Sequence, residues 1–186
     1  AMGPGVLEGI EDNVARANAD DGVDAIVLIG AGATFIAGPD IKIFGTLKTR
    51  AQSLARSEAT HARLKRIEDS QKPLVAAIHG NALGGGLEIA MSCHYRVIAP
   101  DAKVGQPEVL LGIIPGAGGT QRLPRHCGAE MAIEMCRAGK PVNARRAGEP
   151  GIVDNVAGAS LLDDAIEFAR VMALNGETRK TREQTA

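Results

Sequence analysis

Residues 72–88, KPLVAAIHGNALGGGLE, decide the fold of this chain. The first part is a short apolar run that opens on a proline, which is typical of a buried strand and unsuited to a helix interior. The glycines then break the run, and the apolar residues from Leu87 to Met91 predict the start of a helix. Strand, glycine turn and helix in this order are the building unit of an α/β protein.

The rest of the chain repeats this alternation. Val6, Leu7, Ile10 and Val14 mark an amphipathic helix, and His61 is expected on the inner face of a later helix, between Leu54 and Leu64. The other expected elements are strands at 24–30, 74–78 and 95–99, an extended segment at 102–105, and helices at 51–68, from 86, at 120–124, at 129–137 and at 161–173. No repeat or linker divides the chain, so residues 1–186 are predicted to form one domain.

The glycines at 84–86 are the first candidate functional feature. At a helix start they let the backbone approach a ligand closely, and their N–H groups lie beside the positive end of the helix dipole. A developing negative charge is stabilised at such a place. The alternative is a tight turn with Glu88 as an ordinary first-turn carboxylate. Nucleotide-binding motifs do not fit, because the third glycine of the dinucleotide fingerprint and the lysine of a P-loop are both absent.

Glu108 is the second candidate. It begins a very apolar, glycine-rich stretch, residues 108–120, where desolvation is expected to raise its pKa. Two such carboxyl groups that converge on one water provide an acceptor and a donor of protons without a metal or cofactor.

Composition excludes several other classes of function. A net charge of −1 with 2% aromatic residues gives no support for nucleic-acid binding, and no apolar stretch has the length of a membrane span. Cys93, Cys127 and Cys136 form no Cys-x-x-Cys pair, which disfavours metal and disulfide sites and favours a reducing, cytoplasmic setting. Sequence neighbours such as Cys93 and His94 point apart on a helix, and no serine lies in Gly-x-Ser-x-Gly.

Three motifs, at residues 35–42, 79–88 and 105–124, resemble the crotonase superfamily and specifically its enoyl-CoA hydratases. The resemblance runs from roughly Val6 to Val156. It implies an α/β spiral of repeated ββα units, as in ClpP and crotonase, here shortened at both ends, and a fragment of a longer family-type chain. Residues 79–82 and the charged ending at 179–184 are most similar to the hydratase half of bifunctional fatty-acid oxidation enzymes, in which a hydroxyacyl-CoA dehydrogenase follows.

The resemblance implies hydration of a trans-2-enoyl-CoA to a 3-hydroxyacyl-CoA. Glu88 and Glu108 would bind and activate water, the Gly116 N–H would help to hold it, and the Gly85 N–H would bind the thioester oxygen. The expected substrate-binding residues are Ala37, Pro39, Asp40, Ile41, Gly84 and Pro115. No metal or cofactor is implied beyond the coenzyme A thioester substrate. The expected partners are an acyl-CoA and either further copies of the chain or an attached dehydrogenase domain.

Pro39 departs from the family pattern. In the family, the residue at this position supplies a second backbone N–H to the thioester oxygen, and proline has none. The Asp40 N–H could replace it, the site could work with one donor, or the chemistry could differ. The alternatives left open are Δ3-Δ2 isomerisation, another acyl-CoA reaction of the superfamily such as hydrolysis, decarboxylation or dienoyl isomerisation, and an acyl-CoA-binding module without turnover.

Overall fold

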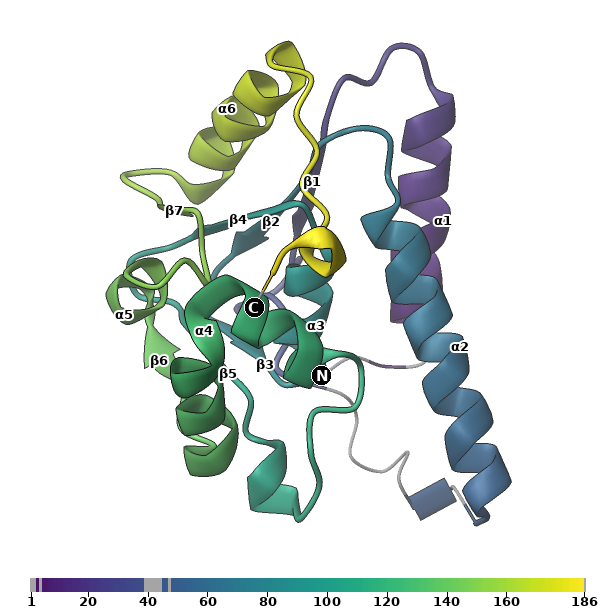
Figure 1. Cartoon of the computed structure of the whole chain (residues 1–186). Coiled ribbons are helices and arrows are strands. Elements are labelled where there is room, and N and C mark those ends of the chain that lie inside the picture. The colour runs from purple at the N-terminus through teal and green to yellow at the C-terminus, as the bar shows by residue number, and fades with distance from the viewer. Residues whose placement is uncertain (1–2, 4, 39–44, 47, 186) are drawn as a thin grey trace.

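The computed structural model of the chain describes residues 3, 5–38, 45–46 and 48–185 (Figure 1). Its α-helices are α1 Val6–Ala19, α2 Arg50–Glu68, α3 Gly85–Ser92, α4 Gly119–Ala138, α5 Ala144–Gly148 and α6 Leu161–Leu174. Its strands are β1 Ile26–Ile29, β2 Leu74–Ile78, β3 Asn81–Leu83, β4 Tyr95–Ile98, β5 Lys103–Gly105, β6 Val142–Asn143 and β7 Asn155–Val156. Two 3-10 turns, η2 Glu108–Leu111 and η3 Thr181–Glu183, complete the described elements.

Two sheets organise the described part of the chain. One has the order β1-β2-β4-β7 with every pair parallel, and the other has the order β3-β5-β6. The chain moves from one sheet to the other and then into a helix, as in β2-β3-α3 and again in β4-β5 before η2 and α4. Ile36 forms a parallel bridge with Ala82 of β3, so the segment between β1 and α2 also passes from the larger sheet to the smaller one. Each turn of strand, strand and helix therefore stacks on the previous one.

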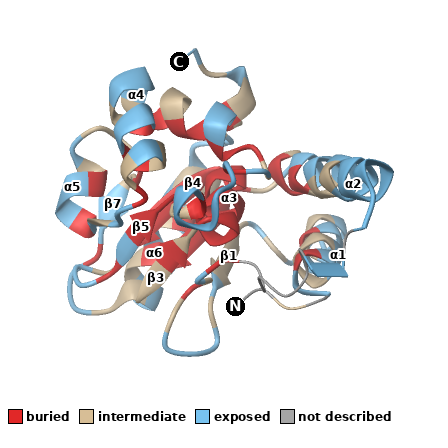
Figure 2. Ribbon diagram, turned by 90° about the horizontal axis from the view of Figure 1, so that it is seen from below, coloured by how far each residue is buried: buried red, intermediate tan, exposed pale blue. Residues whose placement is uncertain are grey.

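The core lies on both faces of the larger sheet. Every residue of β2 is buried, which is typical of a central parallel strand covered by helices. Leu74, Ala76 and Ile78 pack in one cluster with residues of α2 and α3, whereas Val75 and Ala77 pack in a second cluster with residues of α6. Figure 2 shows these buried segments at the centre of the molecule.

The expectation for His61 is wrong. His61 is exposed, and Leu54 is 55% exposed, whereas Leu64 is fully buried. The reason is that the first turns of α2 extend beyond the sheets, so only the last turns of this helix reach the core (Figure 1). A helix with charged residues on most sides has a weak apolar stripe, which makes its inner face hard to identify from spacing.

Some short elements were not predicted. Residues 80–86 were expected to form only a turn, but residues 81–83 form β3, which pairs with β5. The two-residue strands β6 and β7 and the turn η3 also have no counterpart in the expected elements. Such short segments are fixed by distant partners and carry no periodic pattern of their own.

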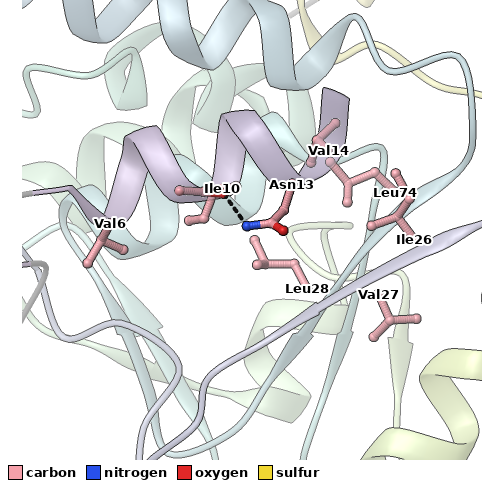
Figure 3. A pocket seen from close by; sticks show the side chains of 9 residues that line it. Val6, Ile10, Asn13, Val14, Ile26, Val27, Leu28 and Leu74 are labelled. Atoms are coloured by element: carbon pink, nitrogen blue, oxygen red, sulfur yellow. Dashed lines mark hydrogen bonds between the residues drawn. The ribbon is translucent and has the colours of Figure 1, made fainter. Parts of the chain in front are cut away.

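A hollow of about 280 Å³ lies between α1 and β1 (Figure 3). Most of its lining is apolar, including Ile10, Val14 and Leu28, and Asn13 in the same wall donates a hydrogen bond to the Gly9 carbonyl at 2.7 Å. Neither candidate glutamate lines it. No helix in the described ranges is both long and apolar enough to cross a membrane.

Two helical glycines give opposite expectations for stability. A Cβ added at Gly9 meets nothing within 4 Å, whereas one added at Gly86 would lie 1.9 Å from the Ile36 carbonyl oxygen. Gly9→Ala should raise the free energy of unfolding by about 0.5–1 kcal/mol, because alanine loses less backbone entropy in a helix. Gly86→Ala should lower it by more than about 1 kcal/mol, because the helix and the 35–38 segment must separate. Urea unfolding of both variants checks this, and equal effects would contradict it.

Candidate active site

Glu88 is placed by the turn between β3 and α3. Gly84 precedes the helix with φ of +54°, a conformation that side chains disfavour, and its carbonyl accepts the first helical hydrogen bond from the Glu88 N–H at 3.0 Å. Glu88 thus occupies the first turn of a helix that is buried throughout, and it is itself only 2% exposed. A carboxylate in such a place requires hydrogen-bond donors.

Those donors are backbone N–H groups of a distant loop. Ala117 N and Gly119 N donate to Glu88 Oε1 at 2.7 and 2.8 Å. Gly119 is the first residue of α4, so the carboxylate lies at the positive end of that helix dipole. Burial raises the pKa of Glu88 above its ordinary value, while the two N–H groups and the charge of Arg122 lower it part of the way back. These three groups favour the ionised form of Glu88.

Glu108 lies beside it at the start of η2. The register of β3 against β5 pairs Leu83 with Gly105, and the Gly84 N–H donates to the Gly105 carbonyl at 2.9 Å. The segments that follow β3 and β5 therefore leave the sheet at the same edge, which brings Glu108 next to the start of α3. A Cβ added at Gly84 would lie only 2.8 Å from Glu108 Oε1. The glycine therefore leaves the space that the second carboxyl group occupies.

The environment of Glu108 favours a proton. Glu108 is 8% exposed, and its pKa is raised to about 7. Burial is the main cause, the hydrogen bond from its own backbone N–H opposes the rise, and the negative charge of Glu88 adds to it. The Gln106 amide, oriented from its hydrogen-bond network, donates to Glu108 Oε1 and Oε2 at 3.0 and 3.1 Å. The two carboxyl groups therefore have different surroundings: Glu88 has two backbone N–H donors and the nearby charge of Arg122, whereas Glu108 has a neutral amide donor.

The start of α3 also presents backbone donors. Gly85 is the first residue of α3, so its N–H has no acceptor within the helix. The 35–38 segment runs past this helix start, since Leu83 N donates to the Ile36 carbonyl at 3.0 Å and Gly86 has no Cβ to block that carbonyl. Ala37 is exposed and Gly38 is buried at the end of this segment.

The structure brings most of the predicted site residues to one region. Glu88, Glu108, Gly84, Gly85 and Pro115 are buried, and Gly116 is exposed in the loop that precedes α4. Pro39, Asp40 and Ile41 lie outside the described residues. Sequence reasoning missed Ala117 and Gly119 as donors, because a backbone N–H has no residue type to reveal it. It also missed Gln106 and Arg122, although Gln106 stands within the same short motif as Glu108.

Rival catalytic groups are engaged in structural contacts. His94 Nδ1 accepts from the Leu74 N–H at 3.1 Å, and its Nε2 lies 3.1 Å from the Glu68 carbonyl. Burial raises the pKa of the Cys93 thiol to about 12, which opposes the thiolate form that a nucleophile needs. Within the described ranges, no group of three or more His, Cys, Asp or Glu side chains is arranged to hold a metal ion.

Comparison with known proteins identifies the family. The family model described as enoyl-CoA hydratase/isomerase matches residues 1–182. A probable enoyl-CoA hydratase of Bacillus subtilis is 44% identical over 173 residues, which are 93% of this chain and 66% of that protein. A peroxisomal fatty acid beta-oxidation multifunctional protein of Oryza sativa is 44% identical over 175 residues, which are 94% of this chain and 24% of that protein. The chain thus spans less than two thirds of the length of these relatives.

Solved structures agree with the sequence comparison. The crystal structure of an enoyl-CoA hydratase from Bacillus anthracis superposes with a TM-score of 0.81 at 36% identity and covers 90% of this chain and 65% of that one. An enoyl-CoA hydratase/isomerase from Xanthobacter autotrophicus gives a TM-score of 0.85 at 30% identity over 94% of this chain and 65% of that one. The predicted crotonase-type α/β fold, shortened relative to these structures, is confirmed. The chain belongs to the enoyl-CoA hydratase/isomerase family.

Proposed function

We propose that the chain catalyses the addition of water to a trans-2-enoyl-CoA, which gives a 3-hydroxyacyl-CoA. The observation that carries the proposal is the pair of buried carboxyl groups, Glu88 and Glu108. Burial raises the pKa of both, to about 7 at Glu108, while two backbone N–H groups and the charge of Arg122 oppose the rise at Glu88. Addition of water needs one group of each kind, a base for the water and an acid for the α-carbon. The names of the similar proteins support the same reaction.

In the proposed mechanism, Glu88 accepts a proton from water while the water oxygen bonds to the β-carbon. Electrons of the double bond move toward the thioester, whose oxygen becomes enolate-like, and Glu108 delivers its proton to the α-carbon. The Gly85 N–H, at the positive end of α3, donates to the thioester oxygen. The exposed Gly116 lies one residue before Ala117 and is proposed to donate its N–H to the water.

Isomerisation of a 3-enoyl-CoA to a 2-enoyl-CoA is a second candidate. The same enolate would form when a carboxylate removes an α-proton, and a carboxyl group with a pKa of about 7 can both accept and release that proton near neutrality. Assays with both substrates separate the two reactions. A chain that binds acyl-CoA and turns over neither substrate would be a binding module instead.

Glu108→Gln should lower kcat for crotonyl-CoA by about 10²–10⁴-fold, because glutamine fills the same space and cannot deliver the proton. KM should change little. Loss of the absorbance of the conjugated thioester measures turnover. Glu130→Gln, a change at an exposed position of α4, is the matched control and should keep the full rate. An active Glu108→Gln enzyme would rule out the proposed acid.

The rate should also depend on pH in a defined direction. Glu108 must carry a proton to act as the acid, and its pKa is about 7, so kcat/KM should decline as the pH rises through about 7. The residual rate of Glu108→Gln should lack this decline. A wild-type rate that increases steadily from pH 6 to pH 9 would contradict the assignment.

Pro39→Ala restores a backbone N–H where the family has its second donor to the thioester oxygen. If the proline leaves the oxygen with one donor, the variant should raise kcat by up to about 10²-fold, the low end of what one such donor contributes. Ala37→Pro is the converse control, since it adds a proline nearby without restoring a donor. A Pro39→Ala rate equal to that of the wild type would show that another group already donates the second hydrogen bond to the thioester oxygen.

A further inference from the structure

A buried ionic cluster joins the C-terminal segment to the body of the protein. Glu68, in the last turn of α2, is 1% exposed. Its Oε2 accepts from Arg122 Nη2 of α4 at 3.1 Å and from Arg182 Nη1 of η3 at 3.2 Å, and its Oε1 accepts from the Arg182 N–H at 3.1 Å. One carboxylate therefore holds two guanidinium groups from segments far apart in the sequence.

The C-terminal segment is fixed in this position by further contacts. Thr181 is 1% exposed, and its hydroxyl lies 3.1 Å from both the Met91 carbonyl and His126 Nε2. Arg182 also pairs with Asp69. In Figure 1 the yellow η3 turn accordingly lies against α4. The buried Thr181 and the ion pair with Asp69 therefore anchor the turn and hold Arg182 against Glu68.

Arg122 connects this cluster to the candidate site. Its Nη1 donates to the Ala117 carbonyl at 3.3 Å, and the Ala117 N–H on the other side of that residue donates to Glu88. A Cβ added at Gly118 would lie 2.4 Å from Arg122 Nη1, so the guanidinium packs directly on the bare backbone of the loop. Arg122 therefore holds the 117–119 loop, which supplies both N–H donors of Glu88.

We propose that Arg182 is a positioning residue, which acts through the buried Glu68–Arg122 pair to hold the loop that binds Glu88. The side chain of Arg182 contacts Glu68, Asp69 and Glu183. It fixes the Glu68 carboxylate, and Glu68 in turn fixes the orientation of Arg122. This inference rests on the proposed hydratase function for its effect on rate, but its effect on Glu88 is independent of turnover.

The charges in the cluster predict the direction in which the pKa of Glu88 should shift in each variant. Arg182 carries a positive charge and Glu68 a negative one, and both are hydrogen-bonded into the cluster that contains Arg122. Removal of Arg182 therefore favours the protonated form of Glu88, and removal of the Glu68 charge favours the ionised form. Other titratable or charged groups lie in the neighbouring elements. Cys93 and His94 interact with Glu68, and Glu108 and Cys136 interact with Glu88. Asp69 pairs with Arg182 and Lys180. These other groups are unchanged in both variants.

The test compares Arg182→Met with Glu68→Gln. The pKa of Glu88 is followed by the carbon-13 signal of its carboxyl group, assigned by its loss in Glu88→Gln. This pKa should rise in Arg182→Met and fall in Glu68→Gln. The limb of kcat/KM that reports the ionisation of Glu88 should move to higher pH in the first variant and to lower pH in the second.

The rate provides a second readout. Arg182→Met should lower kcat for crotonyl-CoA at least about tenfold with little change in KM, because a small displacement of a catalytic group costs that much. Arg182→Lys should recover part of the loss. Arg137→Met, at an exposed position of α4, is the matched control and should retain the wild-type rate and pH profile.

The possible outcomes are distinct. Shifts of opposite sign support the proposal, whereas unchanged titration of Glu88 or shifts in the same direction overturn it. A wild-type protein without turnover overturns the hydratase function alone, because the titration still tests the role of Arg182. If Arg182→Met does not fold, Glu68→Gln decides the sign, and an unchanged pKa of Glu88 in that variant contradicts the proposal.

Discussion

The central constraint of this structure is the burial of two carboxyl groups side by side. An ionised carboxylate removed from water is costly unless donors replace the water, and a second one nearby adds repulsion. The protein solves the first problem at Glu88 with two backbone N–H groups and the field of Arg122, and it solves the second by favouring a proton on Glu108. The difference between these two environments is what makes acid–base chemistry available.

The spiral fold provides this arrangement because neighbouring parallel strands end at the same edge. β3 and β5 are paired in register, and each is followed at once by the segment that carries a glutamate. Space for the carboxyl groups comes from missing side chains. A Cβ at Gly84 would approach Glu108, and a Cβ at Gly119 would lie 3.0 Å from Glu88 Oε1. The glycines therefore define the volume of the site as well as the turns of its backbone.

Much of the fold and the two glutamates could be predicted from sequence, because they leave local patterns. The buried strand β2 is a continuous apolar run after a proline, and the start of α3 follows a glycine cluster. The parts that were missed depend on distant contacts. β3 exists because β5 lies beside it, and the donors of Glu88 are main-chain groups of residue types that give no signal. The face of α2 was misjudged at His61, because spacing alone does not tell where a helix leaves the core.

The contact between Glu68 and Arg182 spans 114 positions of sequence. During synthesis the chain leaves the ribosome from its N-terminus, so α2, α3 and both glutamates emerge well before the turn η3. Until then the Glu68 carboxylate has Arg122 as its only arginine partner among the described residues. The sheets and their helices are complete in a nascent chain that still lacks η3, whereas the ionic cluster behind Glu88 closes only when residues 181–183 have been added.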